Sequence, residues 1–330
     1  MKRKIIKQGH NTLTITLPSV WTKRFNLEAG KEVDLVERDN GLFVTTEKAD
    51  EGRKAEFNIE NMDIATIWRY FMAAYREGCD EITIHFRPSM TLDNPYKFFA
   101  EHKLDLKYGK EREKESPLEF FHSLVNRFIG FEIVDYGRDY VVVKEMSIST
   151  SREFDNSLRR VFLLAEQMFE ETCEALKIND PKILQHLHDV DINLDKFHDY
   201  CVRILNKIGN KESRKMSLLF STLCFLELIG DEFKNISHHL LYDFPKADFK
   251  NIVEIADSIH EQFILYYSLF YKFDTQKVLE ISKIDSGRYF NVKKVYKKAK
   301  TSEEREIFHH LRVVAKYLNA LAELRIEMEF

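Results

Sequence analysis

Proline and glycine are scarce in this 330-residue chain, which contains 6 and 11 of them. Because these residues end helices and form tight turns between strands, their scarcity predicts long helices rather than many short strands. The sequence has no run of about 18 apolar residues, so we expect no membrane insertion. The first residues, MKRKIIKQG, are not followed by an apolar stretch, and we therefore expect no signal peptide.

Cysteine is also rare, and the four that occur form no CxxC pair: Cys79, Cys173, Cys201 and Cys224. Such scattered cysteines predict free thiols and a cytoplasmic protein, rather than a disulfide framework or a zinc finger. No nucleophile–base pattern, Ser/His/Asp arrangement or glycine-rich phosphate loop stands out. We therefore expect no catalytic residues and a protein that is not an enzyme.

Charge is plentiful but unevenly placed. Charged residues are 32% and apolar residues 44% of the chain, and the net charge is −4, which is typical of globular proteins. The first 24 residues contain six basic side chains and no acidic one: Lys2, Arg3, Lys4, Lys7, Lys23 and Arg24. A basic N-terminus on an acidic chain predicts that this end alone contacts a polyanion.

The first fifty residues predict a small domain of strands. The segments KRKIIKQG and LTITLP predict a first pair of short strands. In the second of them, Leu13, Ile15 and Leu17 alternate with threonines, as in a half-buried strand that ends at Pro18. The segment SVWTKRFNL predicts one short helix, and EVDLVE and LFVTTE predict a second strand pair joined at Asn40-Gly41. So short a segment has too little core to fold alone, and dimerisation is the simplest remedy.

The N-terminal pattern resembles the AbrB/SpoVT swapped-hairpin family. The matching residues are Gly9, Leu17, Pro18, Leu27, Gly30, Val33 and Gly41. The resemblance implies a homodimer of interlaced hairpins, over residues 1–50, that binds DNA. Lys4, Lys7, Lys23 and Arg24 would then face the DNA, with Lys2 and Arg3 in a mobile arm. The alternative is a pure dimerisation module with a solubilising basic N-terminus.

The middle of the chain predicts a small α+β domain over residues 55–148. A charged linker, TTEKADEGRK, precedes a helical pattern over residues 58–77 that stops at Gly78. A strand, EITIHF, follows, and then a helix and two strands joined near Gly137. The pattern is compatible with a scaffold or with a small ligand-sensing domain.

Everything after residue 152 predicts helices with short connections, which is typical of antiparallel bundles. The six expected helices span residues 153–177, 180–209, 212–241, 247–272, 274–299 and 302–328. They divide into two similar groups of three, residues 152–245 and 246–330. The expected fold is therefore multidomain: a small swapped-hairpin β domain, a small α+β domain and two tandem three-helix bundles.

Two pairs of carboxylates lie on neighbouring helices of the first bundle. Asp191 and Asp195 are four residues apart, as are Glu227 and Asp231, so each pair lies on one side of its helix. Four carboxylates that converge across two helices predict a site for a hard cation. The alternative is a solvated acidic face without a ligand.

The stretch LELIGDEFKNI, Leu226 to Ile236, resembles the signature of the PhoU family of phosphate-uptake regulators. The resemblance implies two three-helix bundles that carry metal ions on E/D-x-x-x-D motifs, here a divalent or trivalent ion such as Fe, Zn, Mn or Mg. Leu228 replaces the usual arginine of the signature, and His238 stands where an acid is usual. In the second bundle, Asp285, Asn319 and Glu323 occupy the motif positions and indicate an eroded second metal site.

Taken together, the chain resembles archaeal phosphate-uptake regulators. The resemblance implies a cytoplasmic, homodimeric, metal-binding transcription regulator of phosphate homeostasis, with DNA as one partner and a phosphate-transporter or signalling-kinase subunit as a further one. Two alternatives remain open from the residues. One is a metal-dependent phosphatase, and the other is an adaptor to a transporter or kinase that does not bind DNA.

Overall fold

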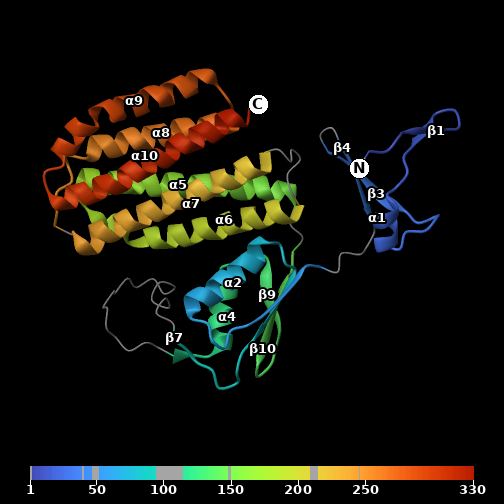
Figure 1. Cartoon of the computed structure of the whole chain (residues 1–330). Coiled ribbons are helices and arrows are strands. Elements are labelled where there is room, and N and C mark those ends of the chain that lie inside the picture. The colour runs from blue at the N-terminus through green and yellow to red at the C-terminus, as the bar shows by residue number, and fades with distance from the viewer. Residues whose placement is uncertain are drawn as a thin grey trace. The chain divides into compact units, whose positions relative to one another are not determined.

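A computed structural model describes residues 2–38, 41–46, 52–93, 114–147, 150–208, 215–244 and 246–330. The chain divides into two compact units, Met1–Glu51 and Gly52–Phe330, which are described separately below (Figure 1). In the described ranges, no helix combines the length and the apolar character that a membrane crossing needs.

The N-terminal unit consists of two strand pairs and one short helix. Its elements are β1 (Ile6–Gln8), β2 (Thr12–Thr14), α1 (Ser19–Arg24), β3 (Val33–Arg38) and β4 (Gly41–Thr46). Both pairs, β1–β2 and β3–β4, are antiparallel. The predicted strands and helix are therefore present, but the strand expected to reach Pro18 ends at Thr14. The second pair closes with Arg38 opposite Gly41, and Asn40 of the predicted turn lies outside the described residues.

Apolar side chains of this unit are largely uncovered. None of residues 2–35 is buried. The exposed fractions of Leu13, Ile15 and Val20 are 67%, 51% and 76%. A unit whose apolar side chains stay in water gains little of the hydrophobic free energy that stabilises a fold, and this matches the thin core expected from the sequence.

The second unit begins with the α+β domain. Its sheet has the order β5–β6–β10–β9, with β5 parallel to β6 and the other neighbours antiparallel. The bounds are β5 (Lys54–Asn58), α2 (Ile64–Arg76), β6 (Glu81–His85), β7 (Leu92–Asp93), β8 (Lys114–Glu115), α4 (Pro117–Val125), β9 (Phe131–Tyr136) and β10 (Tyr140–Glu145). Two expectations were wrong here. Lys54, assigned to the linker, starts a strand, and the first helix begins at Ile64 because Asp63 caps it by accepting from the Thr66 amide.

Aromatic rings fill the core of this domain. The ring centroid of Phe128 lies 5.0 Å from that of Phe71 and 4.8 Å from that of Tyr75, and all three side chains are buried. The Tyr75 hydroxyl donates to the Ile129 carbonyl at 2.9 Å. Helix α2, the loop after α4 and strand β9 are therefore held together by one aromatic cluster.

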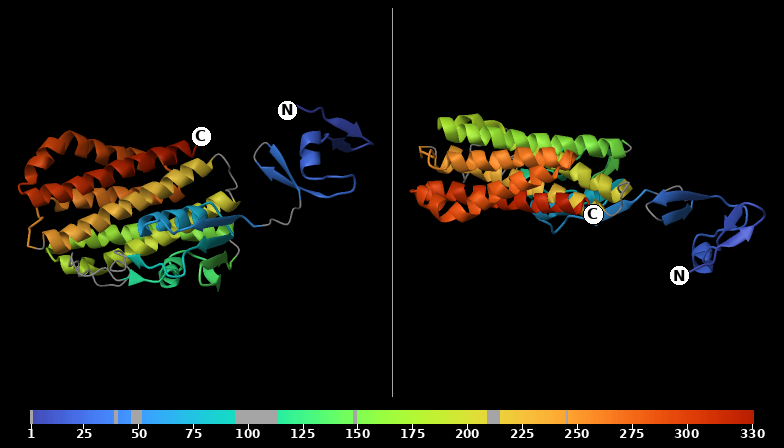
Figure 2. Two further views of the ribbon diagram at one scale, coloured as in Figure 1. Left: turned by 60° about the horizontal axis from the view of Figure 1, so that its bottom comes forward. Right: turned by 90° about the horizontal axis from the view of Figure 1, so that it is seen from above.

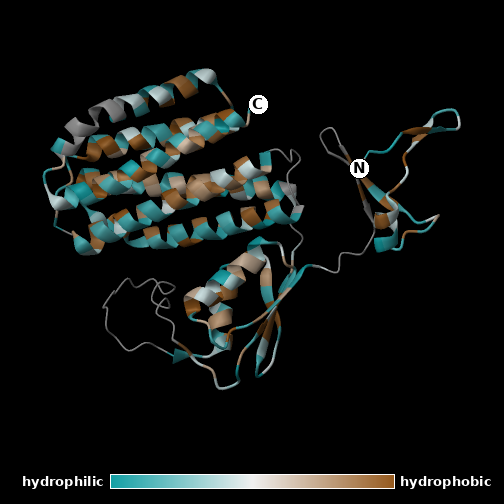
Figure 3. Ribbon diagram, viewed as in Figure 1, coloured by the Kyte–Doolittle hydropathy of each residue, from teal (hydrophilic) through white to brown (hydrophobic). Residues whose placement is uncertain are grey.

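The remainder of the second unit is helical. Its elements are α5 (Ser151–Ile178), the 3-10 helix η1 (Pro181–His186), α6 (Leu187–Ile208), α7 (Met216–His238), the π-helix η3 (His239–Asp243), α8 (Val253–Tyr271), α9 (Thr275–Lys298) and α10 (Ser302–Glu327). Figures 1 and 2 show the long helices side by side, and Figure 3 shows apolar and polar residues alternating along them. Helices α5, α6 and α7 contact one another, as do α8, α9 and α10, so the predicted tandem bundles are confirmed.

Several helix ends differ from the sequence-based bounds. The helix expected to begin at residue 247 begins at Val253. The segment expected as one helix over 180–209 starts with a 3-10 turn, because Pro181 has no amide hydrogen to donate and Asp180 caps the turn instead. The helix expected to reach residue 241 changes to a π-helix at His239. Single π turns often occur at functional sites.

The α+β domain docks on α6 through a fully buried arginine. The Nη1 atom of Arg203 donates to the Tyr75 carbonyl at 2.7 Å, and Nη2 lies 3.0 Å from Glu145 Oε2. The guanidinium carbon also lies 4.7 Å from the centre of the Phe131 ring. At Gly78, a Cβ atom would come within 3.2 Å of Lys207 Cβ, so the glycine permits this close docking.

Candidate functional site

The four predicted carboxylates lie on α6 and α7 where these two helices pack closely. A Cβ atom on Gly230 would lie 3.1 Å from Leu194 Cδ1 and 3.6 Å from Asp191 Oδ1. A side chain at this position would therefore require the Leu194 side chain to shift by a few tenths of an ångström. Gly230 therefore lets α6 and α7 approach closely at the level of Asp191 and Leu194.

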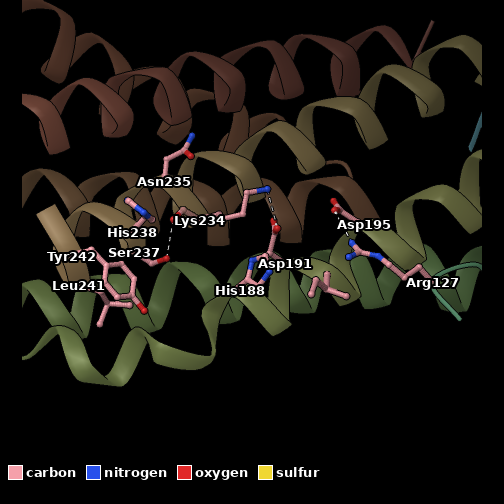
Figure 4. A pocket seen from close by; sticks show the side chains of 11 residues that line it. Arg127, His188, Asp191, Asp195, Lys234, Asn235, Ser237, His238, Leu241 and Tyr242 are labelled. Atoms are coloured by element: carbon pink, nitrogen blue, oxygen red, sulfur yellow. Dashed lines mark hydrogen bonds and ion pairs between the residues drawn. The ribbon is translucent and has the colours of Figure 1, made fainter. Parts of the chain in front are cut away.

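A lysine stands between carboxylates of the two helices. The Lys234 ammonium lies 3.0 Å from Asp191 Oδ2 and also forms an ion pair with Asp231, one turn before it on α7 (Figure 4). The second oxygen of Asp191 is buried without a hydrogen-bond partner among the described residues. Lys234 thus supplies part of the positive charge that the buried carboxylates require.

Two arginines of the α+β domain pair with acids of α6. Arg127 Nη2 lies 3.9 Å from Asp195 Oδ2, and its guanidinium lies over the Trp68 ring at 4.8 Å. Arg76 donates to Asp199 from Nε at 2.7 Å, and its charge acts on Glu227 as well. Part of the positive charge near the acidic face of the first bundle therefore comes from a different domain.

Burial is the main cause of perturbed acidity in this cluster. It raises the pKa of Asp191 and Glu227 above the usual values, and the nearby Asp231 adds to both increases. Burial and the neighbouring Asp191 raise the pKa of Asp195 well above its usual value. Burial alone would lower the pKa of Lys234, but Asp191 and Asp231 raise it above the ordinary value. The cluster has more negative charge than its surroundings favour.

We expect Asp195→Asn to increase stability at pH 8 in metal-free buffer. The folded carboxyl keeps its proton to a higher pH than the unfolded one, so wild-type stability falls as the pH rises from about 4 through the raised pKa. The asparagine side chain does not ionise, so the variant does not lose stability in this way. Its melting temperature at pH 8 should exceed that of wild type by about 2 °C or more. Thermal unfolding between pH 4 and pH 8 measures the difference.

The matched control for this change is Asp155→Asn, because Asp155 is exposed on α5. Its melting curve should follow that of wild type at every pH. Identical pH profiles for wild type and Asp195→Asn would contradict the raised pKa.

The carboxylates are near one another but do not form a compact ligand set. Among the described residues, no three of Asp191, Asp195, Glu227 and Asp231 bring an oxygen each within 4.8 Å of the others. Carboxylate oxygens are ligands that hard cations prefer. One of them, Asp191 Oδ1, has no hydrogen-bond partner among the described residues. Lys234 now holds the space between Asp191 and Asp231, so metal binding here requires the lysine to move.

The corresponding residues of the second bundle are arranged differently. Asn319 accepts from Gln262 Nε2 at 2.7 Å, and Arg288 donates to the other end of the Gln262 amide. Arg288 Nη2 also lies 3.7 Å from Asp285 Oδ1, whereas Glu323 is exposed. Arg288 and Gln262 therefore connect Asp285 to Asn319 but do not reach Glu323. The eroded second metal site stays a prediction.

A pocket of about 320 Å³ reaches the acidic cluster from the surface. Asp191 and Asp195 form part of its wall, together with Arg127 and Lys234 (Figure 4). The other lining residues are His188, Ile192, Asn235, Ser237, His238, Leu241 and Tyr242. The pocket is a route by which a small ligand can reach both the acids and the cations that neutralise them.

Sequence reasoning missed a group of histidines at the end of α7. In the described part of the chain, His239, Glu306 and His310 each offer a ligand atom within 4.8 Å of the others, and so do His238, His239 and Asp243. The available signal was the two histidine pairs, at 238–239 and 309–310. Their proximity depends on how α7 packs against α10, which the sequence pattern did not reveal.

The basic residues predicted to face DNA are all exposed in the N-terminal unit: Lys2, Arg3, Lys4, Lys7, Lys23 and Arg24. Lys23 and Arg24 lie in the last turn of α1, and Lys7 lies in β1, opposite Leu13 of β2. The four cysteines are free, as predicted, and two of them, Cys173 and Cys201, are buried.

Two family models match the chain. The PhoU domain matches residues 158–240, which include α6, α7 and all four carboxylates of the acidic cluster. The antidote-toxin recognition domain MazE, a bacterial antitoxin, matches residues 6–51. No curated protein and no solved structure matches significantly. The expected order of an AbrB-like domain and a PhoU domain is thereby confirmed.

Proposed function

We propose, on the premise that the chain joins a MazE-type domain to a PhoU domain, that it is a DNA-binding regulator of phosphate uptake and not an enzyme. The two domains support a role in phosphate homeostasis. The proposal adds that the N-terminal domain binds DNA and that the PhoU domain responds to a ligand. The observation that carries it is an exposed basic surface on a separate N-terminal unit of a chain that also contains a PhoU domain.

The uncovered apolar residues support a homodimer formed through the N-terminal unit. Leu13, Ile15, Val20 and Leu35 are each more than half exposed in one chain, and a second copy is the partner that interlaced hairpins imply. Pairing would bury these side chains and would double the basic surface with two-fold symmetry. Such a dimer fits two half-sites on a DNA duplex.

The test is an electrophoretic mobility shift with the full-length protein and the phosphate-transport promoter of its own source. We expect a shift at low salt, made by a particle of twice the 39.2 kDa mass of one chain. A scrambled duplex of equal length is the control for sequence-independent binding. No shift at low salt, with and without added metal, would refute the DNA-binding part of the proposal.

We further propose that the acidic cluster binds a metal ion. Asp191, Asp195, Glu227 and Asp231 would hold it after Lys234 has moved away from Asp191, and the ion would replace the cations that now neutralise the carboxylates. The mutual repulsion of the acids and the unpartnered Asp191 oxygen support this assignment. The metal would supply positive charge that a bound anion can share.

Elemental analysis of the purified protein tests the metal proposal. We expect the double variant Glu227→Ala/Asp231→Ala to retain less metal per chain than wild type. The matched control is Glu170→Ala/Glu174→Ala, an exposed pair with the same spacing on α5, which should retain the wild-type amount. Equal metal content in wild type and in the Glu227→Ala/Asp231→Ala variant would defeat the assignment.

A further inference from the structure

Histidines and carboxylates meet where the end of α7 packs against α10. His239 is the first residue of the π-helix η3. Glu306 and His310 lie one turn apart on α10. A potential ligand atom from each of the three lies within 4.8 Å of the other two. We propose that His239, Glu306 and His310 bind a divalent transition-metal ion, Zn²⁺, at a site separate from the acidic cluster.

A carboxylate holds each histidine by its other ring nitrogen. Glu232 Oε2 lies 2.5 Å from His310 Nδ1, and Asp243 Oδ2 lies 2.7 Å from His239 Nδ1. Metal-binding histidines commonly donate the second nitrogen to a carboxylate, which fixes the ring and makes the free nitrogen a better ligand. Both histidines of the proposed site are therefore held in place by carboxylates.

The free nitrogen of His310 lacks a partner. Its Nε2 is buried and has no hydrogen-bond partner among the described residues, although a buried polar atom normally has one. The His310 ring centroid lies 5.2 Å from that of His239, and His239 in turn stacks on Phe244 at 5.4 Å. A metal ion between the two rings would satisfy the unpartnered nitrogen.

The neighbouring group of His238, His239 and Asp243 is a weaker choice. Its two histidines approach the same oxygen of Asp243, with their Nδ1 atoms at 3.4 Å and 2.7 Å. The potential ligand atoms of this group therefore already interact with one another. His310 Nε2, by contrast, has no hydrogen-bond partner among the described residues. Asp243 is then best described as the residue that positions His239.

Two imidazoles and one carboxylate select a class of metal. Magnesium and calcium prefer oxygen ligands throughout, whereas imidazole favours zinc and the late transition metals. Three protein ligands leave the fourth tetrahedral position of Zn²⁺ for water or for a ligand from outside the chain. Since α7 belongs to the first bundle and α10 to the second, the ion would join the two bundles and stabilise their packing.

Metal titration of the full-length protein, stripped with a chelator, tests this proposal. We expect Zn²⁺ to raise the melting temperature by about 5 °C at a hundredfold excess over Kd. We also expect bound Co²⁺ to give the visible absorption of a tetrahedral site with nitrogen ligands. His310→Ala should weaken Zn²⁺ binding at least 100-fold. Glu232→Gln, which removes the partner that positions His310, should weaken it about 10-fold.

His309→Ala is the matched control, because His309 is the exposed neighbour of His310 on α10 and should bind Zn²⁺ as wild type does. Glu306→Gln changes an exposed side chain and tests the site even if His310→Ala does not fold. The Co²⁺ absorption should persist in Glu227→Ala/Asp231→Ala, which separates this site from the acidic cluster. Unchanged Zn²⁺ affinity in Glu306→Gln, or an equal loss in His309→Ala, would overturn the proposal.

Discussion

Replacing Arg203 with leucine is expected to lower the free energy of unfolding of the full chain by about 3 kcal/mol. The change removes the donor to the Tyr75 carbonyl and a guanidinium that contacts the buried Glu145 carboxylate. It also removes the cation from above the Phe131 ring. Leucine replaces some of the packing but none of these polar contacts. The docking of the α+β domain on α6 should therefore be weakened most.

Urea unfolding measures the free energy, and hydrogen exchange shows where it is lost. Amides of α2 and β10 should lose protection before those of α5, because α2 and β10 belong to the domain that Arg203 anchors. Arg160→Leu is the control, since Arg160 is exposed on α5, and it should change the unfolding free energy by less than about 0.5 kcal/mol. A similar small change in Arg203→Leu would mean that the two domains dock by other contacts.

Removing the basic surface of the N-terminal unit should have the largest effect on DNA binding. Each phosphate contact contributes about −0.9 to the slope of log affinity against log salt. If the four predicted residues each neutralise one phosphate, the variant Lys4→Ala/Lys7→Ala/Lys23→Ala/Arg24→Ala should have a slope shallower by about 3.6 per chain. Its affinity at 0.1 M salt should fall at least about 100-fold.

Fluorescence anisotropy with labelled promoter DNA at several salt concentrations measures both quantities. The control removes four exposed lysines from the helical part of the chain: Lys182, Lys272, Lys283 and Lys316. That variant has the same net charge as the test variant and should retain the wild-type slope. Equal losses in both variants would show that overall charge, rather than the N-terminal unit, determines binding to DNA.

Local patterns were sufficient to predict most of the elements. Helix α5, expected over residues 153–177, starts two residues earlier, after Thr150, whose hydroxyl and the Glu153 carboxylate cap it reciprocally. Strand β5 escaped prediction because it is short and joined to a charged linker, and its place in the sheet depends on pairing with β6. The π-helix η3 escaped because no local residue signal distinguishes it from the helix that it extends.

The sequence by itself determined the spacing of the acids on α6 and α7, because 3.6 residues per turn bring residues four apart to one side. It also determined the basic character of the N-terminal unit. Only the tertiary structure decided which charges meet those acids, since Arg76 and Arg127 come from a domain more than sixty residues away along the chain. The same holds for His239 and His310, which the packing of α7 against α10 brings together. Helical spacing is a local property of the backbone, whereas docking depends on side chains that are distant in sequence and must fit together in space.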